Sequence, residues 1–207
     1  MKKKNYQSSI KREVILNRNL TIISKINKEG TFEYVNDYFL HITGYDILEV
    51  LKEPQDMINC KEMPLLIFNE IKKELKKTGK AFGIVKHSAK NGNYFWTIDY
   101  FEAKFDLKGI VDSYFVKRKF LSLLVKKEIE NLYKKLKSIE SHSNIQVSEK
   151  YFHGFLEDKE KTYSEYILSL FQLNETEILD YFNSQEEKIK NKILENRELG
   201  IIERAIQ

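Results

Sequence analysis

The chain contains one cysteine among its 207 residues, Cys60, which excludes an internal disulfide and is typical of a reducing compartment such as the cytoplasm. Glycine and proline are scarce, with eight and two residues, and no glycine-rich phosphate loop or low-complexity linker is present. Long apolar runs are absent, so the sequence predicts no membrane span. The basic N-terminus lacks the apolar core of a secretory signal. We therefore expect a cytoplasmic globular protein.

Signatures of catalysis and of metal binding are also missing. No nucleophile-elbow, kinase or dinucleotide-binding motif occurs, and we expect that the protein is not an enzyme. The four histidines and the one cysteine show no spacing typical of metal ligands, which predicts that no metal is bound. His142, in "ESHSN", has no ATP-binding region to supply phosphate and is interpreted as a loop residue.

Positive charge is concentrated near the N-terminus, where six lysines and arginines precede residue 20 and only Glu13 opposes them. The simpler interpretation of segment 1–17 is a mobile, solvated terminus; contact with an acidic partner or a membrane surface is the alternative. The rest of the chain is nearly neutral and has no basic stripe interleaved with aromatic residues. We therefore expect no nucleic-acid binding.

The apolar pattern predicts an α+β domain over residues 18–120. Two β-branched segments on either side of "KEG" predict a hairpin, and "DYFLHITG" and "DILEVL" predict two short helices after it. The first of these helices is predicted to be capped at Asn36-Asp37 and closed by Gly44. A longer helix is expected between Pro64 and Gly79. Its predicted apolar face consists of Leu65, Phe68, Ile71 and Leu75. Three aromatic-rich segments then predict sequential strands, the first two joined by the turn Asn91-Gly92.

Residues 121–207 are expected to form an all-helical C-terminal extension. The first helix carries an apolar stripe at heptad-like spacing, made of Val125, Ile129, Leu132, Leu136 and Ile139. This stripe favours packing on the chain's own domain, and homodimerisation through it is the alternative. "SHSN" ends the helix, and Ser164 and Asn174 are predicted N-caps of later helices.

Three segments of residues 18–120 resemble a PAS domain, and more closely the aerotaxis-receptor type of PAS domain. They are "VNDYFLHITGY" (35–45), "EPQDM…MP" (53–64) and "GIVKHSAKNGNYFW" (83–96). The resemblance implies a PAS fold, a five-stranded antiparallel sheet with helices on one face. In that family the domain binds FAD and reports redox state to chemotaxis signalling. The tail "SEKYFHGFLEDKEKTYSEYI" is similar to the helical extensions of small stand-alone PAS proteins, which pass their signal to a separate membrane receptor.

The same resemblance implies a set of candidate cofactor-binding residues. They are Asn36, Asn59, Cys60, Glu62, Phe68 and His87. Flavin-binding members usually carry Arg-His-Pro-Asp where this chain has Asn59-Cys60-Lys61-Glu62, and His87 replaces an asparagine. Aromatic residues of the family pattern fall on Ala81 and Lys72. Because the guanidinium and imidazole donors are missing, the sequence favours a pocket without FAD, with FAD binding as the alternative.

Cys60, His87 and the aromatic segment around Trp96 each allow two interpretations. Cys60 is either a thiol activated by Lys61 and a helix N-terminus or, as we favour, a small residue that fills space. His87 either contacts a ligand or, more often for a lone strand histidine, is a surface or half-buried residue. The aromatic segment is expected to divide between core and partner surface.

The leading hypothesis is a cytoplasmic PAS protein that senses or relays a signal in redox or energy taxis through a partner chemoreceptor. The alternative is a ligand-free PAS module that forms a heterodimer with a flavin-bearing PAS partner. Binding of DNA by the C-terminal helices is disfavoured because their charge is mixed.

Overall fold

Five strands form a single antiparallel sheet in the order β2-β1-β5-β4-β3 in this computed structural model, which describes residues 11–173 and 176–183. The strands are β1 (Ile22–Asn27), β2 (Phe32–Val35), β3 (Lys80–Ser88), β4 (Tyr94–Phe105) and β5 (Val111–Phe120). The predicted α+β PAS fold is confirmed by this strand order and by the helices between β2 and β3. β3 lies at one edge of the sheet, so half of its backbone groups need partners from other elements.

The inner face of the sheet is covered by the segment between β2 and β3. It contains α1 (Asp37–Thr43), α2 (Ile47–Val50), the short 3₁₀ helix η1 (Gln55–Ile58) and α3 (Leu65–Thr78). As predicted, Asn36 caps α1 through its side chain and Gly44 ends it with a left-handed backbone, φ 71°.

The predicted apolar face of α3 is partly wrong. Leu65 is 60 % exposed, whereas Leu66, Ile67 and Ile71 are buried. The helix lies so close to β3 at Gly83 that a Cβ atom there would be 2.5 Å from Ile71 Cδ1. Because of this close approach, the face of α3 centred on Ile71 packs on the sheet, and Leu65 is exposed to solvent.

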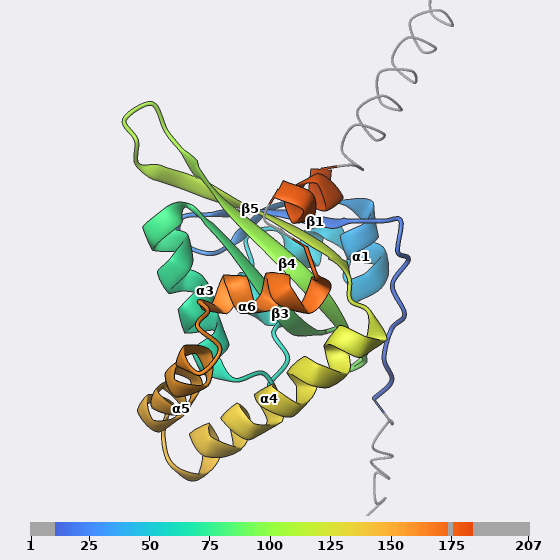
Figure 1. Ribbon diagram of the computed structural model, residues 1–207. Helices are drawn as coiled ribbons and strands as arrows, with labels where there is room; N and C mark the ends of the chain where they lie inside the picture. The colour runs from blue at the N-terminus through green and yellow to red at the C-terminus, as the bar shows by residue number, and fades with distance from the viewer. Residues whose placement is uncertain (1–10, 174–175, 184–207) are drawn as a thin grey trace, which may run out of the picture.

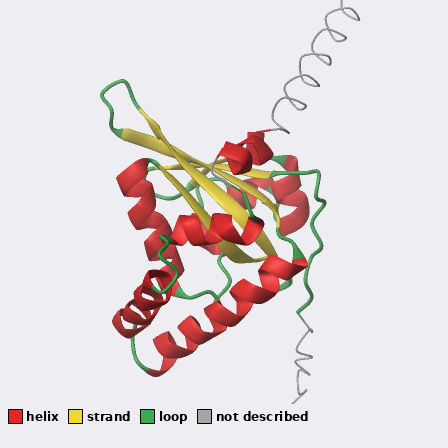
Figure 2. Cartoon of the chain, in the orientation of Figure 1, coloured by secondary structure: helices red, strands yellow, loops and turns green. Residues whose placement is uncertain are grey.

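The C-terminal extension covers the outer face and the β3 edge of the sheet. It consists of α4 (Leu123–His142), α5 (Ile145–Glu157), α6 (Tyr163–Phe171) and the helical segment 176–183. Figure 1 views the sheet through this layer, with α6 across β3 and β4 and with α4 below it. The sheet therefore has helices on both sides, as the distribution of red and yellow in Figure 2 shows.

The apolar stripe of α4 packs on the chain's own domain, as favoured from the sequence. Val125, Ile129, Leu132 and Leu136 are all buried and belong to one core cluster with β3, β4 and α6. The alternative of homodimerisation through this stripe would require α4 to leave the sheet.

Helix caps of the extension differ in part from the prediction. α6 is capped by Thr162, whose side chain accepts from the Glu165 backbone N–H in a capping box, and Ser164 lies inside the helix. Ser164 instead accepts a hydrogen bond from the edge strand β3, as described below. The predicted cap Asn174 and the helices expected over 184–207 lie outside the described residues.

The part of the basic N-terminal segment that the structure describes is anchored at Val14 and Leu16, and its other residues are exposed to solvent. Residues 11–17 run beside the start of β4, where the Val14 N–H donates to the Tyr94 carbonyl at 2.7 Å. Leu16 is 5 % exposed and joins the core of the inner face. Residues 1–10, which carry the lysine cluster, lie outside the described residues.

None of the helices in the described residues combines the length and the apolar character that crossing a membrane requires.

Candidate functional site

A buried ionic cluster lies on the inner face of the sheet. Asp99 and Thr97 alternate with outer-face residues along β4, and both are fully buried. The Asp99 carboxylate lies 3.2 Å from Arg118 Nε on β5 and 3.2 Å from His87 Nε2 on β3. The Thr97 hydroxyl donates to Asp99, and Arg118 Nη1 donates to Ser24 Oγ at 2.8 Å. The cluster thus joins four of the five strands through one carboxylate.

The charge of this cluster is an Asp99–Arg118 pair with a neutral histidine beside it. Burial lowers the pKa of His87; Asp99 opposes this effect, and the Arg118 cation adds to it. A backbone contact with Ile58 opposes the effect of burial in the same direction as Asp99. Such a buried pair has little net value for stability but is costly to break.

A cavity of about 50 Å³ lies between this cluster and α3. Ligand pockets usually have volumes of about 300–1,000 Å³. An isoalloxazine ring does not fit the cavity, because the Arg118 side chain, Asp99 and the α3 residue Phe68 line it. The site residues present therefore do not form a flavin pocket in this conformation.

The cavity brings together three of the six residues predicted from the sequence. Asn59, Phe68 and His87 line it. His87 is 2 % exposed, so its favoured interpretation as a surface or half-buried residue is wrong. Asn36 does not, because its Oδ1 accepts from the N–H groups of Ile23 and Phe39 and its Nδ2 donates to the Thr21 carbonyl. These three hydrogen bonds join the start of β1 to α1.

The other two predicted residues, Cys60 and Glu62, follow the open edge of β3. The Cys60 N–H donates to the Lys86 carbonyl at 3.3 Å, and the Lys86 N–H donates to Met63 Sδ at 3.4 Å. Glu62 forms an ion pair with Lys86, which lowers the pKa of the Glu62 carboxyl group. Cys60 is 6 % exposed within the core, a position that fits the favoured interpretation as a space-filling residue.

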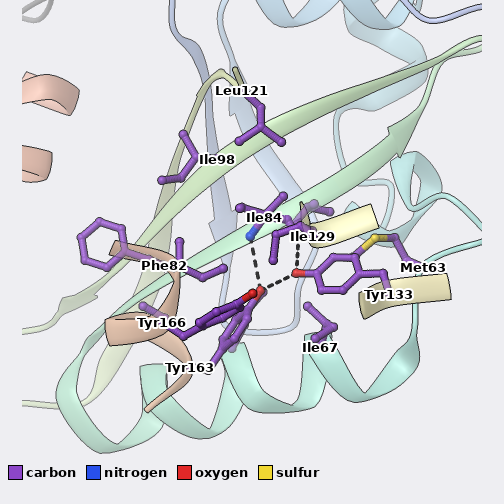
Figure 3. Packing of buried hydrophobic residues seen from close by; sticks show 14 of the residues in the cluster. Met63, Ile67, Phe82, Ile84, Ile98, Leu121, Ile129, Tyr133, Tyr163 and Tyr166 are labelled. Atoms are coloured by element: carbon purple, nitrogen blue, oxygen red, sulfur yellow. Dashed lines mark hydrogen bonds between the residues drawn. The ribbon is translucent and has the colours of Figure 1, made fainter. Parts of the chain in front are cut away.

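The same edge is completed by two tyrosines of the extension. Tyr133 on α4 donates its hydroxyl proton to the Ile84 carbonyl at 2.8 Å, and the Ile84 N–H donates to Tyr163 Oη on α6 at 3.3 Å. The two hydroxyl oxygens lie 2.6 Å apart (Figure 3). Since the Tyr133 proton is already used, Tyr163 donates to Tyr133. Burial raises the pKa of both tyrosines, so both are neutral.

Two further contacts attach the extension to the PAS core. Ser164 Oγ accepts from the Phe82 N–H at 3.5 Å, one hydrogen-bonding position along β3 from Ile84. The Glu140 carboxylate on α4 accepts from the N–H groups of Leu65 and Leu66 at 3.0 and 2.9 Å. Glu140 therefore caps the N-terminus of α3, the helix end that the sequence had associated with Cys60.

The outer-face aromatic residues are covered by the extension, so the interface half of the expected division is formed with flanking helices of the same chain. The Trp96 ring lies 6.1 Å from the Tyr133 ring, and Tyr100 lies 5.7 Å from Phe182. The Lys119 ammonium group donates to the Tyr181 carbonyl. Burial and the nearby Lys117 lower the pKa of Lys119 to about 8.

Comparisons with known proteins agree with this geometry but cover only part of the chain. No protein-family model matches it. The chain is 32 % identical over 76 residues to the aerotaxis receptor of Escherichia coli (strain K12), a match that spans 37 % of this chain and 15 % of that receptor.

Solved structures with a similar course of the chain include a LOV domain and a PAS domain. The light-state LOV domain of the blue-light photoreceptor Aureochrome1 is 18 % identical, covers 53 % of this chain and 88 % of its own, and has a TM-score of 0.49. A PAS domain of a protein from Colwellia psychrerythraea is 15 % identical, covers 49 % and 86 %, and has a TM-score of 0.46. The strand order β2-β1-β5-β4-β3 gives the chain its PAS fold, and its specific activity is a matter for proposal.

Proposed function

We propose that the chain is a non-catalytic PAS signalling protein that relays a signal without a flavin in its own PAS core. The observation that carries this proposal is the content of the inner cavity, which holds a buried Asp99–Arg118 pair within about 50 Å³ of free space. A signal reaches this core as a shift of the sheet and leaves it through α4 and α6, which contact β3 directly.

The signalling context we propose is redox or energy taxis in the cytoplasm. The support is the 76-residue similarity to the aerotaxis receptor, together with the helical extension expected for small PAS proteins that act on a separate receptor. The proposed partner is therefore a membrane chemoreceptor or a flavin-bearing PAS protein. A heterodimer through the outer sheet face is disfavoured, because α4, α6 and segment 176–183 occupy that face.

Reconstitution with FAD tests the proposal. The full chain is unfolded in urea, refolded with excess FAD and desalted, with a known flavoprotein treated in parallel as the positive control. We expect a colourless protein with no absorption near 450 nm above the desalted blank. A yellow protein that releases flavin on denaturation would show that the cavity opens and that the chain is itself a redox sensor.

A further inference from the structure

A cluster of metal-ligand side chains connects α3 of the PAS core to α5 of the extension. Glu70 lies on α3, and Glu149 and His153 lie on α5. One ligand atom from each of the three residues lies within 4.8 Å of the other two, and His153 Nε2 is 3.2 Å from Glu70 Oε1. Residues 149 and 153 are one helical turn apart, so their side chains share a face of α5.

The electrostatics of this cluster favour a cation. The Glu70 side chain is only 12 % exposed, and a second carboxylate, that of Glu149, faces it at short range. Two carboxylates in partial burial repel each other unless a positive charge lies between them. The nearest lysine, Lys73, has its ammonium group 4.0 Å from Glu70 Oε1 and is 67 % exposed, so it offsets little of this repulsion.

The ligand chemistry selects a class of ion. We propose that Glu70, Glu149 and His153 bind a divalent transition-metal ion of the Zn²⁺ type and thereby fix α5 to α3. Two carboxylate oxygens and one imidazole nitrogen suit Zn²⁺, Co²⁺ or Mn²⁺, whereas Ca²⁺ and Mg²⁺ prefer oxygen ligands alone. Three protein ligands leave a coordination position for water or another ligand.

A ligand can reach this open coordination position through a groove beside the cluster. A groove of about 770 Å³ runs between α3, α5 and the segment before α6, and both Glu70 and His153 line it. A bound ion would join α3 of the PAS core to α5 of the extension. This inference does not depend on the proposed relay, since it concerns a different face of α3 from the inner cavity.

The sequence predicted no metal site because the spacing of histidine and cysteine gives no information about acidic residues on a distant helix. Glu70 is separated from His153 by 83 residues, and only the packing of α5 on α3 brings them together. The i,i+4 pair Glu149/His153 was the available signal.

Metal titration of the full chain, first stripped with EDTA, tests the proposal with Co²⁺ and Zn²⁺ as the probes. We expect one Co²⁺ per chain, a visible d–d absorption band that Zn²⁺ abolishes, and a higher melting temperature with Zn²⁺. Both His153→Gln and Glu149→Gln should weaken binding at least tenfold, because even outer partners of metal ligands contribute about 10–100-fold. The matched controls His142→Gln and Glu130→Gln, both on α4 and outside the groove, should bind like wild type.

Circular dichroism checks that each variant is folded. Because the two α5 variants change different ligand residues, each tests the site separately. Absence of Co²⁺ and Zn²⁺ binding at millimolar concentration overturns the proposal. Binding that both α5 variants retain unchanged also overturns it, because the ion would then lie elsewhere on the chain.

Discussion

Tyr133 on α4 and Tyr163 on α6 place their hydroxyl oxygens 2.6 Å apart at the backbone of Ile84 and satisfy both of its outward-facing groups. An edge strand normally presents such groups to water or to another chain. Here the helical extension uses them, so that the position of α4 and α6 is tied to the position of β3. This contact is the physical basis of the relay that we propose.

Replacement of Tyr133 by Phe tests the edge contact. The variant leaves the buried Ile84 carbonyl without a donor, and we expect a loss of about 1–3 kcal/mol in the free energy of unfolding. Urea denaturation followed by far-UV circular dichroism measures this loss. The control is Tyr151→Phe, since Tyr151 is 42 % exposed on α5 and should change stability by less than about 0.5 kcal/mol. Equal stabilities of the two variants would contradict the assigned role of Tyr133.

Replacement of Glu140 by Gln tests the cap on α3. The carboxylate is 7 % exposed and accepts from two N–H groups at a helix N-terminus, so loss of its charge should cost about 0.5–2 kcal/mol. Glu130→Gln on the same helix is the matched control, because Glu130 only pairs with the exposed Lys134. If both variants unfold at the same urea concentration, Glu140 does not hold α4 to α3.

Replacement of Gly83 by Ala tests the close packing of α3 on β3. The added methyl group would lie 2.5 Å from Ile71 Cδ1, and overpacking of this kind costs about 1–3 kcal/mol. Ile71→Val removes the obstructing methyl group, so the double variant should recover part of the stability lost by Gly83→Ala. Strictly additive losses in the double variant would show that the clash is not the cause.

The pH dependence of stability tests the protonation state of His87. Burial lowers the pKa of His87 below its ordinary value of about 6.5, so the unfolded chain binds a proton first as the pH falls. The contribution of His87 to stability is complete above pH ~6.5, decreases below that pH and levels off below the folded-state pKa. His87→Asn should remove this decrease below about pH 6.5. Urea midpoints that fall equally in wild type and variant would show that His87 is not kept neutral.

Local patterns in the sequence were sufficient to predict the strands and helices of the PAS core. The contacts between residues far apart in the sequence could not be predicted from them. The hairpin, the Asn36 cap and the three sequential strands each follow from short signals such as Asn91-Gly92, and all are confirmed. Thr97 and Asp99 alternate with apolar and aromatic residues along β4. Such alternation usually marks a solvated face of a sheet, whereas here both faces are buried.

The candidate site was predicted only in part for the same reason. Asn59, Phe68 and His87 do meet at the cavity, but the partner that defines it, Arg118, comes from a strand without a distinctive motif. Tyr133 adjoins the predicted stripe of α4, yet its target Ile84 is 49 residues away in sequence. No local pattern predicts such a pairing, because it depends on how α4 lies on the sheet.

The central claim is that the inner ionic cluster and the outer helices are coupled through the sheet, and amide hydrogen exchange of Thr97→Val tests it most directly. This variant removes the hydroxyl donor to Asp99 on the inner face. Thr21→Val is the matched control, because the buried Thr21 hydroxyl has no hydrogen-bond partner among the described residues. The account predicts that Thr97→Val accelerates exchange in β3 and also in α4 and α6, whereas Thr21→Val leaves these helices unchanged. Faster exchange confined to β4 and β5, with α4 and α6 as in wild type, would contradict it.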